Sequence, residues 1–137
     1  MRKIVLCFCA AMGLVGASYA ELTGRCPEVS QVKYNPIAQQ FIAHDPNGAG
    51  VWTSISPIVV TPVQAINNTF YEAATDTSVG TQCVYKNPNV DNGYGFMMTN
   101  AVFSTAIHFG PNWMLSNGGY VCQSGNPEGC LFQIVLQ

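Results

Sequence analysis

Apolar and polar positions along the chain alternate over short stretches that are separated by clusters of Gly, Pro and Asn. Pro presets φ, and Gly and Asn tolerate positive φ, so each cluster is typical of a turn. The stretches between the clusters are rich in β-branched and aromatic residues, which indicates an antiparallel β protein. We therefore expect strands at Val51–Thr61, Gln82–Lys86, Gly95–Phe103, Ala106–Phe109, Gly119–Gln123 and Leu131–Leu136.

One segment departs from this two-residue period. A Thr-Pro pair at positions 61 and 62 is typical of a helix N-cap and first helical position, and apolar residues then recur every three or four positions. The pattern predicts a helix from Thr61 to about Ala74, packed on an antiparallel sheet, and hence a single small α+β domain. An all-β sandwich is the alternative. The buried side of the helix would consist of Val63, Ile66, Phe70 and Ala73.

The first 20 residues have the pattern of a cleavable signal peptide. Arg2 and Lys3 precede an apolar run over Ile4–Val15, and small residues at 17–20 suit cleavage before Glu21. The apolar run is shorter than the ~20 residues that a membrane span needs, and no cysteine follows it closely enough for a lipoprotein. Residues 21–137 then form one domain, located in the periplasm or outside a bacterial cell.

Charge excludes two classes of partner. Removal of the signal peptide leaves three basic residues, Arg25, Lys33 and Lys86, against seven acidic ones. Nucleic acids and anionic lipid surfaces are bound by clustered Lys and Arg. We therefore expect neither nucleic acid nor a membrane as a partner, and no membrane span after cleavage.

Four cysteines remain after cleavage: Cys26, Cys83, Cys122 and Cys130. An even number in a small exported domain indicates two disulfides, for which three pairings exist. None of the spacings suits a zinc site, so we expect no metal. We favour Cys122–Cys130 with Cys26–Cys83, because Asn126–Gly129 reverses the chain between the first two.

The inventory of catalytic groups is small. His44 precedes Asp45, but the following Pro-Asn-Gly predicts a surface turn in which the aspartate bonds backbone amides. His108 lies in an apolar stretch. No nucleophile elbow, phosphate loop or metalloprotease motif is present in the sequence. We therefore expect no catalytic residues, no cofactor and no enzymatic activity, with a small hydrolase that uses His44 or His108 as an alternative.

Aromatic residues are the better candidates for function, because Tyr and Trp are enriched at binding surfaces. Trp52 and Phe70 are expected in the core. Tyr94 stands between glycines in a tight turn, and Trp113 and Met114 follow Gly-Pro-Asn, so these three residues are the candidate binding residues.

The order of these features resembles a domain-of-unknown-function family of small secreted bacterial proteins. The family occurs in gammaproteobacteria, and one periplasmic member from a Coxiella-type organism is associated with the Dot/Icm type IV secretion system. The resemblance covers nearly the whole mature chain. It rests on Cys26-Pro27, Gly50-x-Trp52, Phe70-x-x-Ala73, Cys83-x-Tyr85, Trp113, Cys122 and Cys130-x-Phe132.

The resemblance implies a periplasmic protein that supports secretion-dependent growth inside host cells, and it brings no catalytic residues. Together these observations predict a non-enzymatic periplasmic binding or assembly protein. A secreted inhibitor or ligand-binding module is the alternative. The expected partner is a protein, with a second copy of the chain as a further candidate.

Overall fold

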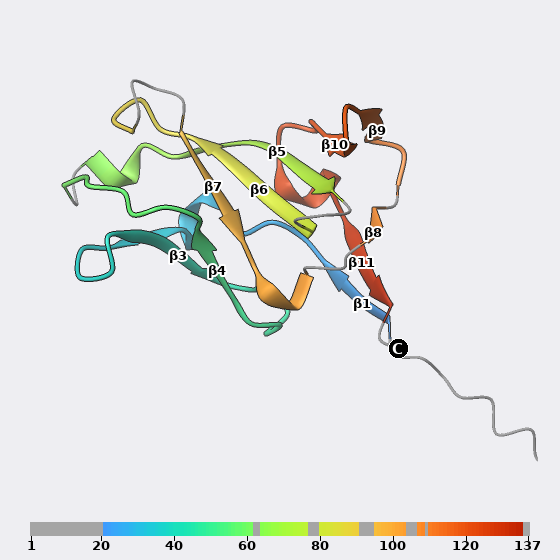
Figure 1. Ribbon diagram of the computed structural model, residues 1–137, viewed down its shortest axis with the longest axis horizontal. Coiled ribbons are helices and arrows are strands. Elements are labelled where there is room, and N and C mark those ends of the chain that lie inside the picture. The colour runs from blue at the N-terminus through green and yellow to red at the C-terminus, as the bar shows by residue number, and fades with distance from the viewer. Residues whose placement is uncertain are drawn as a thin grey trace, which may run out of the picture.

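A computed structural model describes residues 21–61, 64–76, 80–90, 95–103, 107–108 and 110–135. The described strands form two antiparallel sheets (Figure 1). The larger sheet has eight strands in the order β2-β3-β4-β7-β6-β5-β10-β9. They are β2 (Lys33–Asn35), β3 (Gln40–His44), β4 (Val51–Ser54), β5 (Thr69–Asp76), β6 (Gly80–Lys86), β7 (Phe96–Thr99), β9 (Trp113–Ser116) and β10 (Gly119–Cys122).

The smaller sheet joins the two ends of the domain. Its order is β1-β11-β8, with β1 (Glu21–Gly24) antiparallel to β11 (Phe132–Val135) and β11 antiparallel to β8 (Ile107–His108). Strands β1 and β11 lie at the side of the molecule opposite the β2–β3 turn (Figure 1). The expected signal peptide lies outside the described residues.

The expected helix from Thr61 to Ala74 is wrong, and with it the α+β fold class. Each helical segment in the described part of the chain is a single 3-10 turn of three residues. Where the helix was expected, one such turn leads into the eight-residue strand β5. The fold is therefore mostly β. The four turns are η1 (Val29–Gln31), η2 (Gln64–Ile66), η4 (Ala101–Phe103) and η5 (Pro127–Gly129).

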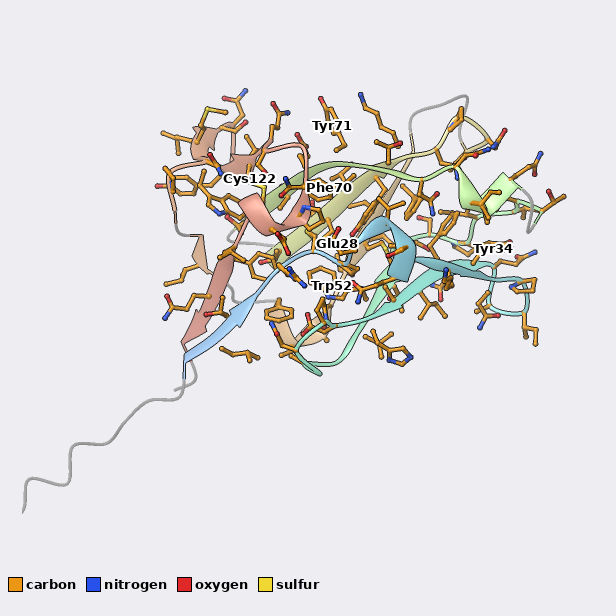
Figure 2. All side chains as sticks on the ribbon, turned by 180° about the vertical axis from the view of Figure 1, so that it is seen from behind. Glu28, Tyr34, Trp52, Phe70, Tyr71 and Cys122 are labelled. Atoms are coloured by element: carbon orange, nitrogen blue, oxygen red, sulfur yellow. A yellow bond between two sulfur atoms is a disulfide. The ribbon has the colours of Figure 1, made fainter. Side chains whose placement is uncertain are left out.

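A β-bulge explains why the sequence of β5 has a helical spacing. The register of β5 against β6 shifts between Phe70 and Glu72, which leaves Tyr71 as the extra residue. Phe70 and Ala73 consequently both face the core although they are three residues apart. Tyr71 lies on the outside of the sheet (Figure 2).

The expected strands exist, but several are shorter than predicted. The stretch Val51–Thr61 forms a strand only to Ser54, and Pro57 explains the end of pairing, since proline has no N–H to donate to a ladder. The stretch Gly95–Phe103 is strand only over Phe96–Thr99 and then becomes the turn η4.

Aromatic rings fill the inner face of the large sheet. Phe41 on β3 and Phe96 on β7 stack with ring centroids 3.9 Å apart, although β4 lies between their strands. The small side chain of Ser54 on β4 leaves room for this contact, and its hydroxyl accepts the N–H of Phe41 at 3.1 Å. The series of ring contacts runs through Tyr34, Phe41, Phe96, Tyr85 and Phe70.

A second aromatic cluster joins the two sheets. Trp52 of β4, which is fully buried as expected (Figure 2), contacts Phe103 and Phe132 at centroid distances of 5.6 and 6.1 Å. Gly24 of β1 lies against the same rings, so closely that a Cβ at this position would overlap Phe132 and Phe103. Close packing of this kind fixes β1 and β11 on the core.

The N-terminal segment is attached to the middle of the large sheet. Cys26 forms a disulfide with Cys83 on β6. Tyr85 lies two residues further along the same face, and its hydroxyl donates to the carbonyl of Pro27 at 2.6 Å. Burial raises the pKa of this hydroxyl well above its usual range, and the charge of Glu28 adds to the shift. The hydroxyl therefore remains a donor over the physiological pH range.

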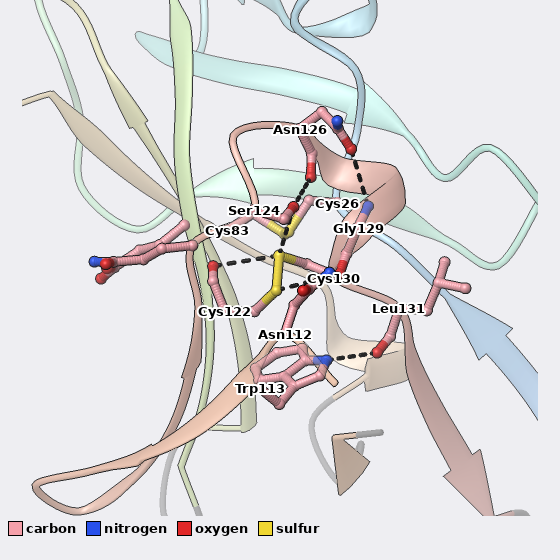
Figure 3. The surroundings of a disulfide bond; sticks show 12 residues. Cys26, Cys83, Asn112, Trp113, Cys122, Ser124, Asn126, Gly129, Cys130 and Leu131 are labelled. Atoms are coloured by element: carbon pink, nitrogen blue, oxygen red, sulfur yellow. Dashed lines mark hydrogen bonds between the residues drawn. A yellow bond between two sulfur atoms is a disulfide. The ribbon is translucent and has the colours of Figure 1, made fainter. Parts of the chain in front are cut away.

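The second disulfide joins Cys122 to Cys130, as the turn between them predicts. The loop widens into η5, which Asn126 caps by accepting the N–H of Gly129 at 2.9 Å (Figure 3). This extra turn lets the two cysteines meet although a tight hairpin would not align them. The two disulfides fit a secreted protein. No helix among the described residues is long and apolar enough to cross a membrane.

Candidate binding site

The three binding residues expected from the sequence do not come together in one site. Trp113 is only 8% exposed, and its indole N–H donates to the carbonyl of Leu131 at 2.7 Å (Figure 3). Its neighbour Met114 is 55% exposed on β9. Tyr94 lies outside the described residues. Of the expected contact residues, Met114 is thus the one whose side chain the structure places at the surface.

The two histidines lie on different sheets. His44 is exposed at the end of β3, and His108 pairs through its backbone with Phe132 in the smaller sheet. Asp45, next to His44, is buried, and its carboxylate accepts the backbone N–H groups of Asn47 at 2.9 Å and Ala49 at 3.2 Å. The expected structural role of Asp45 in the turn is confirmed.

The other oxygen of Asp45 accepts the indole N–H of Trp52 at 3.3 Å. The carboxylate is therefore used by the fold on both of its oxygens. Within the described ranges, no three His, Cys, Asp or Glu side chains are grouped so that they could hold a metal ion.

A cavity of about 430 Å³ opens where β4 separates from β7. The last hydrogen bond that the described chain makes between the two runs from the N–H of Ile55 to the carbonyl of Met97, at 3.0 Å. Beyond it, residues 56–60 turn away toward the β2–β3 turn, and the cavity lies between this segment and β7. Its volume is within the range of ligand pockets in proteins.

Residues 55–60 form one wall of the cavity. Two hydrogen bonds hold the wall at Ile58: its N–H donates to the carbonyl of Gln39 at 2.6 Å, and its carbonyl accepts the hydroxyl of Tyr34 at 2.6 Å. The same hydroxyl accepts the N–H of Val60 at 3.4 Å. Tyr34 is in turn packed on Phe41. The wall is therefore connected to the aromatic core.

The opposite wall includes Asn89 and Val90, in the described part of the loop that follows β6. Asn87 is fully buried, and its side-chain amide donates to the carbonyl of Gln64 at 3.1 Å and to the side-chain oxygen of Asn68 at 2.7 Å. Its own carbonyl accepts the N–H of Val90, a lining residue, at 3.1 Å. These contacts hold the loop against η2 and keep the cavity open on this side.

Val84 and Met97 form a cross-strand pair at the bottom of the cavity. Gly95 closes the space between β7 and β6. It has a φ of 89°, and a Cβ here would overlap the carbonyl oxygen of Tyr85. Glycine is therefore required at this position for two independent reasons.

The described side chains of the lining are mostly apolar, and none of them is titratable. Its described members include Ser56 and Asn89 as the polar side chains, and aliphatic or aromatic side chains otherwise. Such a cavity can desolvate an apolar group at a gain of about 25 cal/mol per Å² of apolar surface. The apolar members are Ile55, Pro57, Ile58, Val59, Val60, Val84, Val90, Phe96 and Met97.

Sequence reasoning missed this cavity because it treated residues 51–61 as one strand. The available signal was Pro57, which interrupts an otherwise β-branched run and predicts that pairing stops nearby. That the freed segment lines a cavity depends on Tyr34 and Gln39, which are distant along the chain from Val60. No family model, curated protein or solved structure matches the chain.

Proposed function

We propose that the mature chain is a non-enzymatic exported binding protein that takes an apolar group of a partner protein into the cavity between residues 55–60 and β7. The observation that supports this proposal is the lining itself, which is open to the surface and whose described side chains are mostly apolar and include no titratable group. Such a surface binds by burial of apolar area and not by charge.

A protein is a better partner for this site than a small molecule. Small-molecule pockets enclose most of the ligand and orient it with several polar groups. Here the apolar character continues outside the cavity, because Ile55 is 53% and Val59 79% exposed at its rim. Ile37, which is 95% exposed, lies two residues from the Gln39 carbonyl that holds the wall. Exposed apolar side chains gathered on one surface are typical of a site that contacts another protein.

The resemblance to the secreted bacterial family supports a narrower form of the proposal. In that form, the partner belongs to the envelope part of a type IV secretion apparatus, and the protein is periplasmic. Deletion of the gene should then reduce growth that depends on this secretion system. The Val59→Asp variant should reproduce the deletion, whereas a His44→Ala, His108→Ala double variant that folds should still support growth. An inactive double variant would instead favour the hydrolase alternative.

Site-specific photocrosslinking tests the cavity directly. A photoreactive phenylalanine derivative at position 59, expressed in the native host, should give a discrete adduct with one envelope protein. The matched control is position 115, because Leu115 and Val59 are both 79% exposed, and Leu115 lies on β9 whereas Val59 lies in the segment after β4. Met97→Lys, at the bottom of the cavity, should abolish the adduct from position 59. An adduct of the same mass from both positions, or one that survives Met97→Lys, contradicts the proposal.

A further inference from the structure

Strand β9 ends the large sheet opposite to β2. It joins β10 through a two-residue turn, because Ser116 pairs with Gly119. In such a hairpin the backbone groups of the residues next to the turn point at each other, and the direction alternates along the strand. The N–H and carbonyl of Met114 therefore point toward β10, and those of Leu115 point away from the sheet.

The side chains of β9 leave this edge open to association. Leu115 is 79% exposed, and it lies beside Tyr120 of β10 on the same face. Natural edge strands are usually protected by charge, proline or a bulge. Strand β2, at the other end of the sheet, follows this rule, since it begins with the exposed Lys33 and is followed by Pro36. Strand β9 has none of these features.

Charge favours a second copy of the chain as the partner at this edge. Two copies with a net negative charge repel each other wherever their carboxylates meet. No charged residue occurs between Asp91 and Glu128 in the sequence, so β9, β10 and their turn carry no charge. Two copies can therefore approach through this hairpin without bringing like charges together.

We propose that two copies of the chain pair antiparallel through β9, with the two-fold axis at Leu115. A two-fold axis perpendicular to an antiparallel pair places one residue opposite itself. At Leu115 the N–H of each copy donates to the carbonyl of the other, which completes the ladder. The two Leu115 side chains then lie side by side, between the two Tyr120 rings, in one continuous apolar row.

The area of this contact predicts a weak dimer. The strand has four residues, so the pairing is much smaller than the roughly 1,200–2,000 Å² interface of a stable complex. We expect a Kd on the order of 0.1–1 mM, and hence a monomer at about 10 µM and a substantial dimer fraction near 1 mM. Sedimentation equilibrium of the mature protein over this range measures the Kd.

Two charge variants test the register. Leu115→Asp places two carboxylates opposite each other, and Leu115→Lys two ammonium groups, so each variant alone should weaken association at least about tenfold. An equimolar mixture of the two should recover association, since position 115 of one copy then meets the opposite charge on the other. Ile66→Asp on η2 is the matched control, since Ile66 is 75% exposed against 79% for Leu115, and it should leave the Kd unchanged.

A third variant tests the backbone contact. Leu115→Pro removes an N–H that does not belong to the β9–β10 ladder, so the hairpin should fold, as near-ultraviolet circular dichroism can verify. Its Kd should rise by more than about tenfold. A protein that remains monomeric at 1 mM overturns the proposal, and so does association that survives Leu115→Pro. Failure of the two charge variants to associate when mixed overturns the register. None of these outcomes affects the photocrosslinking result at position 59.

Discussion

Replacement of the Cys26–Cys83 pair by alanine should destabilise the protein more than replacement of the Cys122–Cys130 pair. The first disulfide joins residues with a sequence separation of 57, and the second a separation of 8. By chain entropy, loops of these sizes correspond to about 4 and about 2.5 kcal/mol at 25 °C. All four cysteines are fully buried, so the loss of packing is similar for the two pairs. The difference of roughly 1.5 kcal/mol then reports loop closure.

Urea unfolding of the two double-alanine variants, followed by near-ultraviolet circular dichroism, measures this difference. The m-value should rise in both variants and more in the one without the long loop, because its unfolded chain expands further. Tyr85→Phe is the control for the other attachment of the N-terminal segment. It removes the hydrogen bond to Pro27 and leaves the disulfide Cys26–Cys83 intact, so its loss of stability reports that hydrogen bond without a change in loop closure. Equal destabilisation of the two double variants, or a larger loss from the short loop, would refute the loop-closure argument.

Gly95→Ala should destabilise the protein by about 2–3 kcal/mol or more, because it combines a strained φ with an overlap on the Tyr85 carbonyl. Gly110 has a φ of 99° and open space around it, so Gly110→Ala should show the backbone cost alone in the same urea assay. Phe70→Ala should lower the free energy of unfolding by roughly 3–5 kcal/mol, whereas Tyr71→Ala next to it should lower it by less than about 1 kcal/mol. Similar losses from the two variants would contradict the bulge. Because burial raises the pKa of Tyr85, the folded state keeps the proton that the unfolded chain loses. The contribution of Tyr85 to stability is therefore complete below about pH 10, and the free energy of unfolding falls as the pH rises above this value. In urea titrations at alkaline pH, Tyr85→Phe should lose less stability with rising pH than the unsubstituted protein.

Local sequence rules were sufficient for the parts of this protein that depend on short-range chemistry. The turn at Asn126–Gly129 brings Cys122 to Cys130 and, with four cysteines, leaves Cys26 to pair with Cys83. The Asp-Pro-Asn-Gly turn likewise predicts the backbone contacts of Asp45. In the turn of Asp45 and the pair Cys122–Cys130, the interacting residues are close in sequence. For Cys26 and Cys83, the count of four cysteines leaves no other partner once the first pair has formed.

The structure of residues 64–76 could not be decided in this way, because two periods coincide there. Phe70 and Ala73 are three residues apart on a helix face and equally on a bulged strand. Only pairing with β6, a partner further along the chain, selects the strand. Trp113 was misjudged for a related reason. Its local Gly-Pro-Asn context suggests a loop, whereas the carbonyl of Leu131 that holds its indole is brought there by the second disulfide and η5.

The sequence by itself thus predicted the two disulfides with their pairing and the burial of Trp52 and Phe70. The tertiary structure alone decided the candidate site and the open edge. The cavity exists because Pro57 ends the pairing of β4 while Tyr34 and Asn87 hold its two walls. These contacts join segments that no local pattern relates. Their effect depends on long-range packing, which a periodicity of two or three to four residues does not encode.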